Sequence, residues 1–332
     1  MIQKTASSIS IMIVTVTLNP VLDRTLTVAH IEFDEMTRAT ATRQDWGGKG
    51  FNVSRALLAL GLESTAMAFV GGATGETLSK GLAALQIDTD FVPVQEETRT
   101  NVVIVDDSNG RYIKVNEPGP FIQPDELNTF VDRVRARVRP GDLWILAGSL
   151  PPGVPVDFYA RLIQLIQSSG ARTVLDASGE ALQIGCTAHP YLVKPNAVEA
   201  NEITGQFLHL PEDARMATEL ILDQGVELAA LSMGADGLTL SSNKETFHAR
   251  PPAVAIGNPT GAGDALVAGM TYALIYDLPL ADVARWGVAT GTAAAMSKGV
   301  GVGSLEEVEV LLPQIQVWPV TAISKVENHE PR

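Results

Sequence analysis

The chain has 332 residues, 45% of them hydrophobic, which is enough for one large α/β domain with a buried core or for two modest domains, and we expect one domain with a small appendage. Its formal net charge of -14 argues against a nucleic-acid partner, because duplex binding depends on clustered Lys and Arg. A single cysteine, Cys186, excludes an intrachain disulfide, and no stretch approaches the roughly 18 consecutive apolar residues of a membrane span, so we expect a cytoplasmic protein without a membrane partner.

Short runs rich in β-branched residues alternate along the chain with segments of helical periodicity. The predicted strands are 12–17, 65–70, 143–147, 173–176, 191–193 and 228–232. Predicted helices between them include 51–60, 124–138, 157–168 and 211–223. This alternation predicts β-α-β units, and therefore a parallel sheet covered by helices on both faces.

Two segments, 24–46 and 91–115, interrupt this alternation because they are strand-like and have few helical signals. The second contains Asp107-Ser-Asn-Gly110, a turn signal between two β runs. We expect the two segments to pair into a small sheet that covers one edge of the main sheet as a lid.

A further hairpin is predicted around 242–244, between strands 238–241 and 246–249. Residues 12–315 are interpreted as a single domain, with terminal extensions at 1–11 and 316–332.

The segment Asn258-Pro-Thr-Gly-Ala-Gly-Asp264 is the most informative, because it leads directly into an apolar helix over 265–275. Gly261 and Gly263 allow backbone amides around Ala262 to turn toward one point, where the helix N-terminus adds partial positive charge. Asp264 at that point can accept a proton from an attacking hydroxyl while the amides stabilise a transferred phosphoryl group. The residues alone leave open the alternative that Asp264 only caps a helix.

Neither a G-x-x-x-x-G-K-[ST] loop nor a G-x-G-x-x-G dinucleotide fingerprint is present, so other segments must handle phosphate. Eight motifs recur in order along the chain: Thr17-Leu-Asn-Pro-Val-Leu-Asp23, Gly47-Gly-Lys-Gly-Phe-Asn52, Thr98-Arg-Thr-Asn101, Gly148-Ser-Leu-Pro-Pro-Gly153, Leu175-Asp-Ala-Ser-Gly-Glu180, Lys194-Pro-Asn-Ala-Val-Glu199, Leu231-Ser-Met-Gly-Ala-Asp-Gly237 and Gly261-Ala-Gly-Asp264. With these motifs the chain, from about 12 to about 312, resembles the ribokinase-like PfkB carbohydrate kinases. Within that family it resembles the branch of 1-phosphofructokinase, tagatose-6-phosphate kinase and the minor 6-phosphofructokinase.

The resemblance implies a fold class: α/β, a three-layer ribokinase-like fold with a mostly parallel central sheet flanked by helices and a small β-sheet lid. It also implies ATP with Mg²⁺ as phosphoryl donor and a homodimer formed through the lids. One departure is Gly257-Asn-Pro-Thr260, where many relatives carry a Val or Thr before the first glycine in a Ser/Thr-rich approach.

On the sugar side, the resemblance marks Asp23 as an acceptor of hydrogen bonds from sugar hydroxyls, although an Asx-turn after Pro20 is the alternative. Gly47 and Gly48 allow the backbone close to a ligand, or form a plain turn before a helix. The predicted substrate contacts are completed by Asn52 for hydroxyls, by Lys49 and Arg99 for phosphate, and by Lys114, which is otherwise a solvated strand lysine.

On the nucleotide side, Lys194 and Asn196 come at the end of a predicted strand, the edge where open α/β sheets bind ligands. Asn196 and Glu199 are expected to hold magnesium through water, unless Glu199 is only an exposed acid in the first turn of a helix. Ser232, Gly234 and Gly237 form a turn suited to nucleotide phosphates and ribose, or an ordinary hairpin turn.

The resemblance therefore predicts ATP-dependent phosphorylation of a sugar phosphate, with fructose 1-phosphate converted to fructose 1,6-bisphosphate as the leading reaction. Fructose 6-phosphate and tagatose 6-phosphate are the nearest alternative substrates. A kinase of an unphosphorylated sugar or nucleoside is disfavoured by Lys49 and Arg99, because a neutral sugar needs neither cation. A sensor of sugars or nucleotides is disfavoured by the presence of both Asp264 and Glu199, since a binder needs no base.

Overall fold

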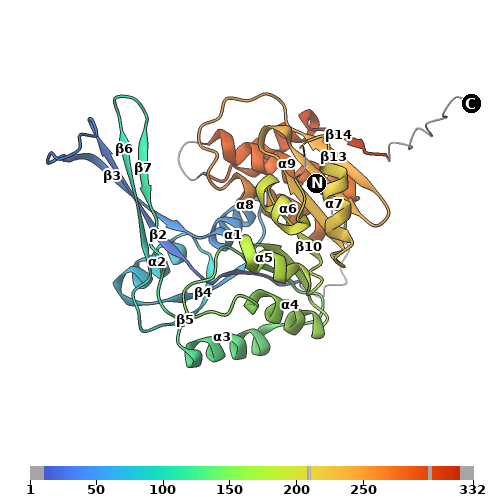
Figure 1. The fold of residues 1–332 in the computed structure, drawn as a ribbon, viewed down its shortest axis with the longest axis horizontal. Coiled ribbons are helices and arrows are strands. Elements are labelled where there is room, and N and C mark those ends of the chain that lie inside the picture. The colour runs from blue at the N-terminus through green and yellow to red at the C-terminus, as the bar shows by residue number, and fades with distance from the viewer. Residues whose placement is uncertain (1–10, 208, 210, 298–300, 322–332) are drawn as a thin grey trace, which may run out of the picture.

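The computed structural model describes residues 11–207, 209, 211–297 and 301–321. Over these residues the main body has three layers, with one sheet between two groups of helices, and a second small sheet projects from one side (Figure 1). The predicted α/β fold class is thereby confirmed.

The described main sheet has 10 strands, and most neighbouring pairs are parallel. In spatial order they are β14 (Gln316–Pro319), β13 (Thr246–Arg250), β12 (Leu238–Ser242), β11 (Leu228–Ser232), β10 (Leu192–Val193), β9 (Arg172–Asp176), β8 (Leu143–Ala147), β1 (Ile13–Thr17), β4 (Thr65–Val70) and β5 (Asp88–Pro93). Only the pairs β11/β12, β12/β13 and β13/β14 are antiparallel. Strands β1 and β8 are buried along their whole length, as expected for strands covered on both faces.

Helices cover both faces of this sheet. One face carries α1 (Lys49–Ala59), α2 (Gly72–Ala84), α8 (Ala262–Ile275), α9 (Leu280–Met296) and α10 (Leu305–Leu311). The other carries α3 (Pro124–Arg137), α4 (Phe158–Ser168), α5 (Gly179–Cys186), α6 (Ala197–Thr204) and α7 (Ala214–Leu222). Short 3-10 turns at Gly234–Asp236 and Leu312–Gln314 complete the elements.

Helix α8 is apolar nearly all round because it packs between neighbouring helices. Its residues from Asp264 to Thr271 are all buried, with α1 and α9 as its principal partners. Helices α8 and α9 pack closely against each other, because Gly269 lies against Trp286 and Gly291 lies against Ala262. Although α8 is this apolar, no described helix is long and apolar enough to cross a membrane.

The small sheet is the lid, formed in spatial order by β3 (Ala39–Gly47), β2 (Val21–Val28), β6 (Thr100–Asp106) and β7 (Tyr112–Val115). These strands project to the left of the body in Figure 1. The turn predicted at 107–110 joins β6 to β7. At the base of the lid the indole of Trp46 fills the space where a side chain at Gly81 of α2 would lie, so lid and body are packed together there.

The strand boundaries differ from the predicted ones in three places. The lid begins at Val21 rather than 24, and 91–93 belongs to β5, which pairs with β4 in the main sheet because Val92 is buried against the body. The predicted extension 316–332 begins with β14, which pairs with β13. The rest of that extension after 321, and residues 1–10 of the predicted extension 1–11, lie outside the described residues.

Candidate active site

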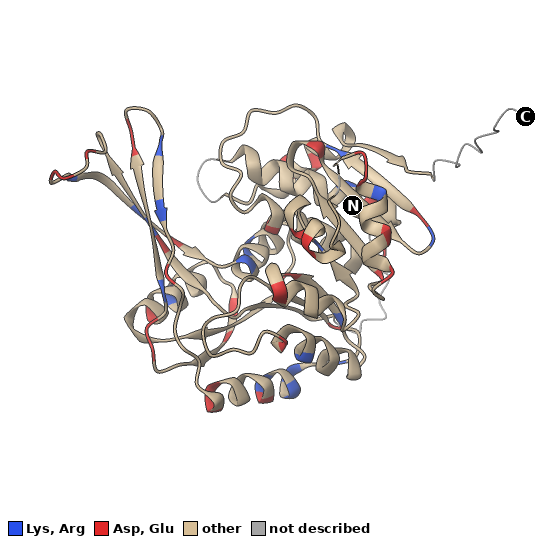
Figure 2. Ribbon diagram, in the orientation of Figure 1, with Lys and Arg blue, Asp and Glu red and all other residues tan. Residues whose placement is uncertain are grey.

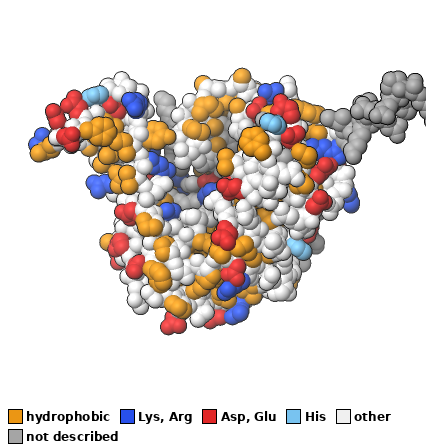
Figure 3. Space-filling model, in the orientation of Figure 1, with side chains coloured by type: hydrophobic (Ala, Val, Ile, Leu, Met, Phe, Trp, Pro, Cys, Tyr) orange, Lys and Arg blue, Asp and Glu red, His pale blue; other side chains and the backbone are white. Residues whose placement is uncertain are grey.

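Most of the predicted site residues lie either at the carboxyl ends of the parallel strands or on the lid strands. The ends of β8, β9 and β10 lie side by side there, and α1 and α8 begin at the same edge. The space-filling view shows a hollow between lid and body whose floor carries both basic and acidic side chains (Figure 3). Figure 2 shows Lys and Arg positions on the lid strands and at the start of α1.

Asp264 lies in the first turn of α8, where it is 7% exposed. The residue that caps this helix is Gly261, in the left-handed region with φ 85°, so Asp264 is inside the helix rather than at its cap. Its Oδ2 accepts a hydrogen bond of 2.8 Å from Nδ2 of Asn52 on α1. Burial, reinforced by the carboxylate of Asp176, raises the pKa of Asp264 from 3.8 to about 7, against the opposing effects of Asn52, Lys49 and Lys194.

The predicted anion hole at 261–263 is only partly available. The amide of Ala262 donates to the carbonyl of Pro259 at 3.2 Å, whereas the amides of Gly263 and Asp264 belong to the first turn, which has no intrahelical acceptor. A Cβ atom on Gly263 would lie 3.9 Å from Nζ of Lys194, so a cationic group adjoins these amides.

Asp176, at the end of β9, is a charged centre that was not among the predicted site residues. Its Oδ1 lies 2.9 Å from Nζ of Lys49 and 3.2 Å from Nζ of Lys194, and its side chain is 1% exposed. Its Oδ2 is buried without a hydrogen-bond partner among the described residues. The available signal was an acidic residue in a shared motif at the carboxyl end of a predicted strand.

Three nearby acids together raise the pKa of Lys49. Burial by itself would lower the pKa of Lys49, but Asp176, Asp264 and Glu199 raise it above its ordinary value. Lys49 therefore stays charged beside Asp176.

On the sugar side, Asp23 lies in β2 rather than in a turn, so the Asx-turn alternative is wrong. Its Oδ1 accepts a hydrogen bond of 3.0 Å from Nδ2 of Asn101, a lid residue given no separate role in the sequence analysis. Burial raises the pKa of Asp23, while Asn101, Lys114 and Arg99 counteract that rise. The fold thus gathers Asp23, Arg99 and Lys114 near one another.

The two glycines before α1 are explained by close approach. A side chain at Gly47 would overlap the carboxylate of Asp23. Gly48 has φ 135°, and a Cβ there would lie 2.6 Å from Cγ2 of Thr17. These glycines let the strand end turn into α1 directly beside Asp23.

Arg99 is bound to the backbone in three places. Its Nη2 donates to the carbonyl of Asn19 at 2.9 Å, its Nη1 to Glu117 at 3.0 Å and its Nε to Pro20 at 3.4 Å. Since a guanidinium has five N–H groups, these three bonds leave two that bind nothing else among the described residues.

On the nucleotide side, Asn196 and Glu199 form a capping box at the start of α6. Asn196 Oδ1 accepts from the amide of Glu199 at 3.0 Å, and Glu199 Oε2 accepts from the amide of Asn196 at 2.8 Å. Glu199 is 7% exposed, so it is not the exposed first-turn acid of the alternative interpretation. Ser232 is joined to this segment by its amide, which donates to the carbonyl of Pro195 at 3.0 Å.

Gly234 and Gly237 lie in the turn between the antiparallel strands β11 and β12. No group of three or more His, Cys, Asp and Glu side chains in the described part of the chain could hold a metal ion by itself. The residues fit a magnesium ion bound mainly through water and phosphate, because Glu199 has a second oxygen and Asp176 Oδ2 has no partner in the described chain.

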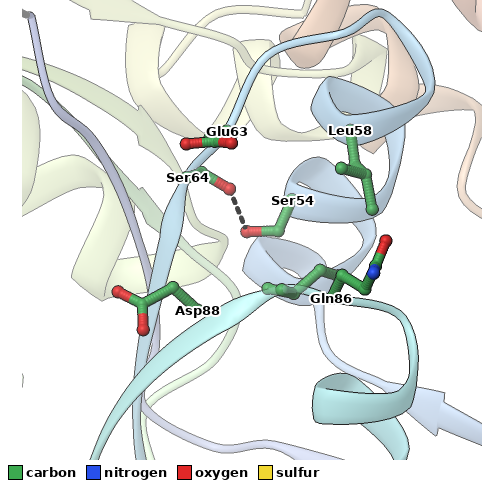
Figure 4. A pocket seen from close by; sticks show the side chains of 7 residues that line it. Ser54, Leu58, Glu63, Ser64, Gln86 and Asp88 are labelled. Carbon is green, nitrogen blue, oxygen red and sulfur yellow. Dashed lines mark hydrogen bonds between the residues drawn. The ribbon is translucent and has the colours of Figure 1, made fainter.

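Two hollows lie away from Asp264 and Asp176. One, of about 240 Å³, lies at the opposite edge of the sheet between α1 and the starts of β4 and β5, where Ser64 donates to Ser54 at 2.9 Å (Figure 4). The other, of about 370 Å³, is lined by Arg99 and by Glu96, Glu97 and Glu117. Neither contains Asp264.

Comparisons with known proteins indicate the family of the chain. The family model described as "pfkB family carbohydrate kinase" matches residues 12–307. The chain is 36% identical to a 1-phosphofructokinase of Bacillus subtilis (strain 168), over 92% of this chain and 99% of that protein. It is 28% identical to a tagatose-6-phosphate kinase of Staphylococcus epidermidis, over 93% of this chain and 100% of that protein.

Among solved structures, phosphofructokinase-2 from Escherichia coli in complex with potassium has a TM-score of 0.88 and 32% sequence identity, covering 92% of this chain and 99% of that one. The chain belongs to the pfkB family of carbohydrate kinases. It is a carbohydrate kinase, an ATP-dependent phosphotransferase, which confirms the predicted family and enzyme class.

Proposed function

We propose that this kinase phosphorylates fructose 1-phosphate to fructose 1,6-bisphosphate with ATP and Mg²⁺. The observation that carries the proposal is the group formed by Asp264, Asn52, Lys49 and Asp176 at the start of α8, in a chain that is 36% identical to a 1-phosphofructokinase. Fructose 6-phosphate and tagatose 6-phosphate are the alternative acceptors, because the chain is also similar to a 6-phosphofructokinase and to a tagatose-6-phosphate kinase.

In the proposed reaction, Asp264 takes the proton of the acceptor hydroxyl. A carboxylate with a pKa of about 7 is a stronger base than an ordinary aspartate and is substantially ionised near neutral pH. Bound ATP supplies the phosphoryl group, and Mg²⁺ neutralises part of its charge. The amides of Gly263 and Asp264, together with Lys49 and Lys194, stabilise the negative charge that develops on the transferred group.

Asp23 holds sugar hydroxyls in this proposal, and Arg99 and Lys114 hold the phosphate that does not react. Support comes from their common position around Asp23 and from the two guanidinium N–H groups that remain on Arg99. The three backbone bonds of Arg99 orient the guanidinium, so little side-chain entropy would be lost on binding.

Magnesium is assigned to Asn196 and Glu199 through water, beside the turn of Ser232, Gly234 and Gly237 for the nucleotide. The capping box supports this assignment because it fixes the carboxylate of Glu199 while leaving Oε1 for water.

A homodimer through the lids is part of the proposal. Strand β7 is exposed along its whole length, and it carries Tyr112, Ile113 and Val115, which are large apolar residues. Exposed apolar strands of this kind are normally covered by a partner. Sedimentation of the wild type and of Tyr112→Glu would test it, since a monomeric wild type contradicts the dimer.

The substrate assignment is tested by kcat/KM for fructose 1-phosphate, fructose 6-phosphate, tagatose 6-phosphate and free fructose, measured by ADP release. We expect fructose 1-phosphate to give the highest value. A higher value for another sugar phosphate would replace the assigned substrate, and a higher value for free fructose would contradict a phosphate-binding acceptor site.

A further inference from the structure

The side-chain amide of Asn52 connects two helices that begin at the site. Asn52 lies in the first turn of α1 and Asp264 in the first turn of α8, 212 positions later, and Nδ2 of Asn52 donates to Oδ2 of Asp264 at 2.8 Å. The other end of the same amide, Oδ1, is buried without a hydrogen-bond partner in the described chain.

We propose that Asn52 is a positioning residue for the catalytic base: its amide fixes one oxygen of Asp264, turns the other toward the acceptor hydroxyl and keeps the carboxylate ionised. This inference rests on the proposed function, in which Asp264 is the base. It adds a role to the sugar contact that the sequence analysis predicted for Asn52.

The physical reason is that an amide N–H can only donate. An ionised carboxylate accepts a hydrogen bond more strongly than a protonated carboxyl group, which is neutral and keeps only part of its accepting capacity. A donor at 2.8 Å therefore favours the ionised form and opposes the effect of burial. It also removes one of the two directions from which a hydroxyl could approach the base.

Other charges also act on Asp264, and Lys49 and Lys194 favour its ionisation together with Asn52. Lys49 from α1 and Lys194 after β10 both contact Asp176 at the end of β9, and that acid acts against the ionisation of Asp264. Glu199 on α6 raises the pKa of Lys49. On α9, which packs along α8, Asp282 and Arg285 pair with each other near the far end of α8.

The position of Asn52 is fixed by close packing. A Cβ on Gly50 would lie 2.5 Å from Oγ1 of Thr17 and 3.0 Å from the carbonyl oxygen of Val16, so α1 meets β1 with almost no space between them. The backbone N–H of Asn52 donates to the carbonyl of Gly48 at 3.0 Å. The unpaired Oδ1 is then available to a sugar hydroxyl, which would relieve the cost of a buried acceptor and fix sugar and base relative to each other.

The inference is tested by titrating the Asp264 carboxyl by ¹³C NMR without substrate, its signal being assigned by its loss in Asp264→Asn. Asn52→Leu keeps the shape of the side chain without the donor, and Asn52→Ala removes the donor while admitting water. We expect the Asp264 titration to move upward by about one pH unit in both variants, since a hydrogen bond to a charged group is lost. The acid limb of kcat/KM against pH should move in the same direction.

Asn101→Ala is the matched control, because it removes an Asn to Asp hydrogen bond of the same kind from Asp23. Asn101→Ala should leave the pKa of Asp264 unchanged. If the pKa of Asp264 is unchanged or lowered in a folded Asn52→Leu or Asn52→Ala protein, the inference is wrong. Either folded variant is sufficient to decide. Because the titration needs no turnover, a chain that phosphorylates none of the tested sugar phosphates would refute the proposed function separately.

Discussion

The ammonium of Lys49 lies 2.9 Å from the carboxylate of Asp176, a residue 127 positions later in the chain. Lys194 approaches the same oxygen at 3.2 Å, so one buried acid stands between two cations. Such a cluster is costly to build and strongly disrupted when one partner is removed. It therefore connects the stability of the fold to the chemistry of the site.

Asp176→Asn should lower the free energy of unfolding by on the order of 3 kcal/mol, because it leaves Lys194 buried without a counter-charge. It should also move the acid limb of the pH-rate profile to lower pH, since the charge of Asp176 raises the pKa of Asp264. Urea denaturation and kcat/KM against pH measure the two effects. Asp157→Asn is the control, because Asp157 forms an exposed pair with Arg161 and should change neither quantity.

Asp264→Asn should lower kcat by roughly 10² to 10⁴-fold and leave sugar binding nearly intact, because the amide keeps the size of the carboxylate but cannot take a proton. Single-turnover kinetics and direct binding of the sugar phosphate check both parts. Near-normal turnover would exclude Asp264 as the base.

The same variant has a predictable effect on stability. Asp264 has a pKa of about 7 in the fold against 3.8 without it, so its stabilising contribution is complete below about pH 3.8 and is lost as the pH rises through 7. Asp264→Asn should therefore be more stable than the wild type near pH 8, by up to about 4 kcal/mol, and the difference should shrink toward about pH 4. A stability difference that does not change with pH would contradict the raised pKa.

Glu199→Gln should raise the magnesium concentration needed for half-maximal rate, because the side chain keeps its capping bond to Asn196 but loses its charge. Thermal unfolding should change little. Glu307→Gln is the matched control, since Glu307 forms the same capping box with Ser304 on α10, away from the site. If both variants behave alike, Glu199 is structural.

Arg99→Ala should weaken use of the sugar phosphate by on the order of 2 to 4 kcal/mol in kcat/KM, which is the range for truncating a buried charged contact. Use of free fructose should barely change. Arg43→Ala, which removes an exposed lid arginine paired with Asp45 at 2.7 Å, is the control. Equal losses for phosphorylated and free sugars would mean that Arg99 serves only to hold Asn19, Pro20 and Glu117 together.

Local sequence signals predicted most of the body. Strands β1, β4, β8 and β11 and helices α3, α4 and α8 lie within a few residues of their predicted ranges, because hydrophobic periodicity and turn residues act locally. The lid boundary was wrong at 91–93, since a short β run carries no information about which sheet it will join. For the same reason β14 was taken for part of an extension.

The sequence by itself determined the order of the elements, the family and the set of motif residues from which the site is built. Only the tertiary structure decided which of these residues touch: Asn52 with Asp264, Lys49 and Lys194 with Asp176, and Asn101 with Asp23. Each of these contacts depends on which strands are neighbours in the sheet and on how α1 packs against α8. Such relations arise from burial summed over the whole core, so no spacing along the chain specifies them.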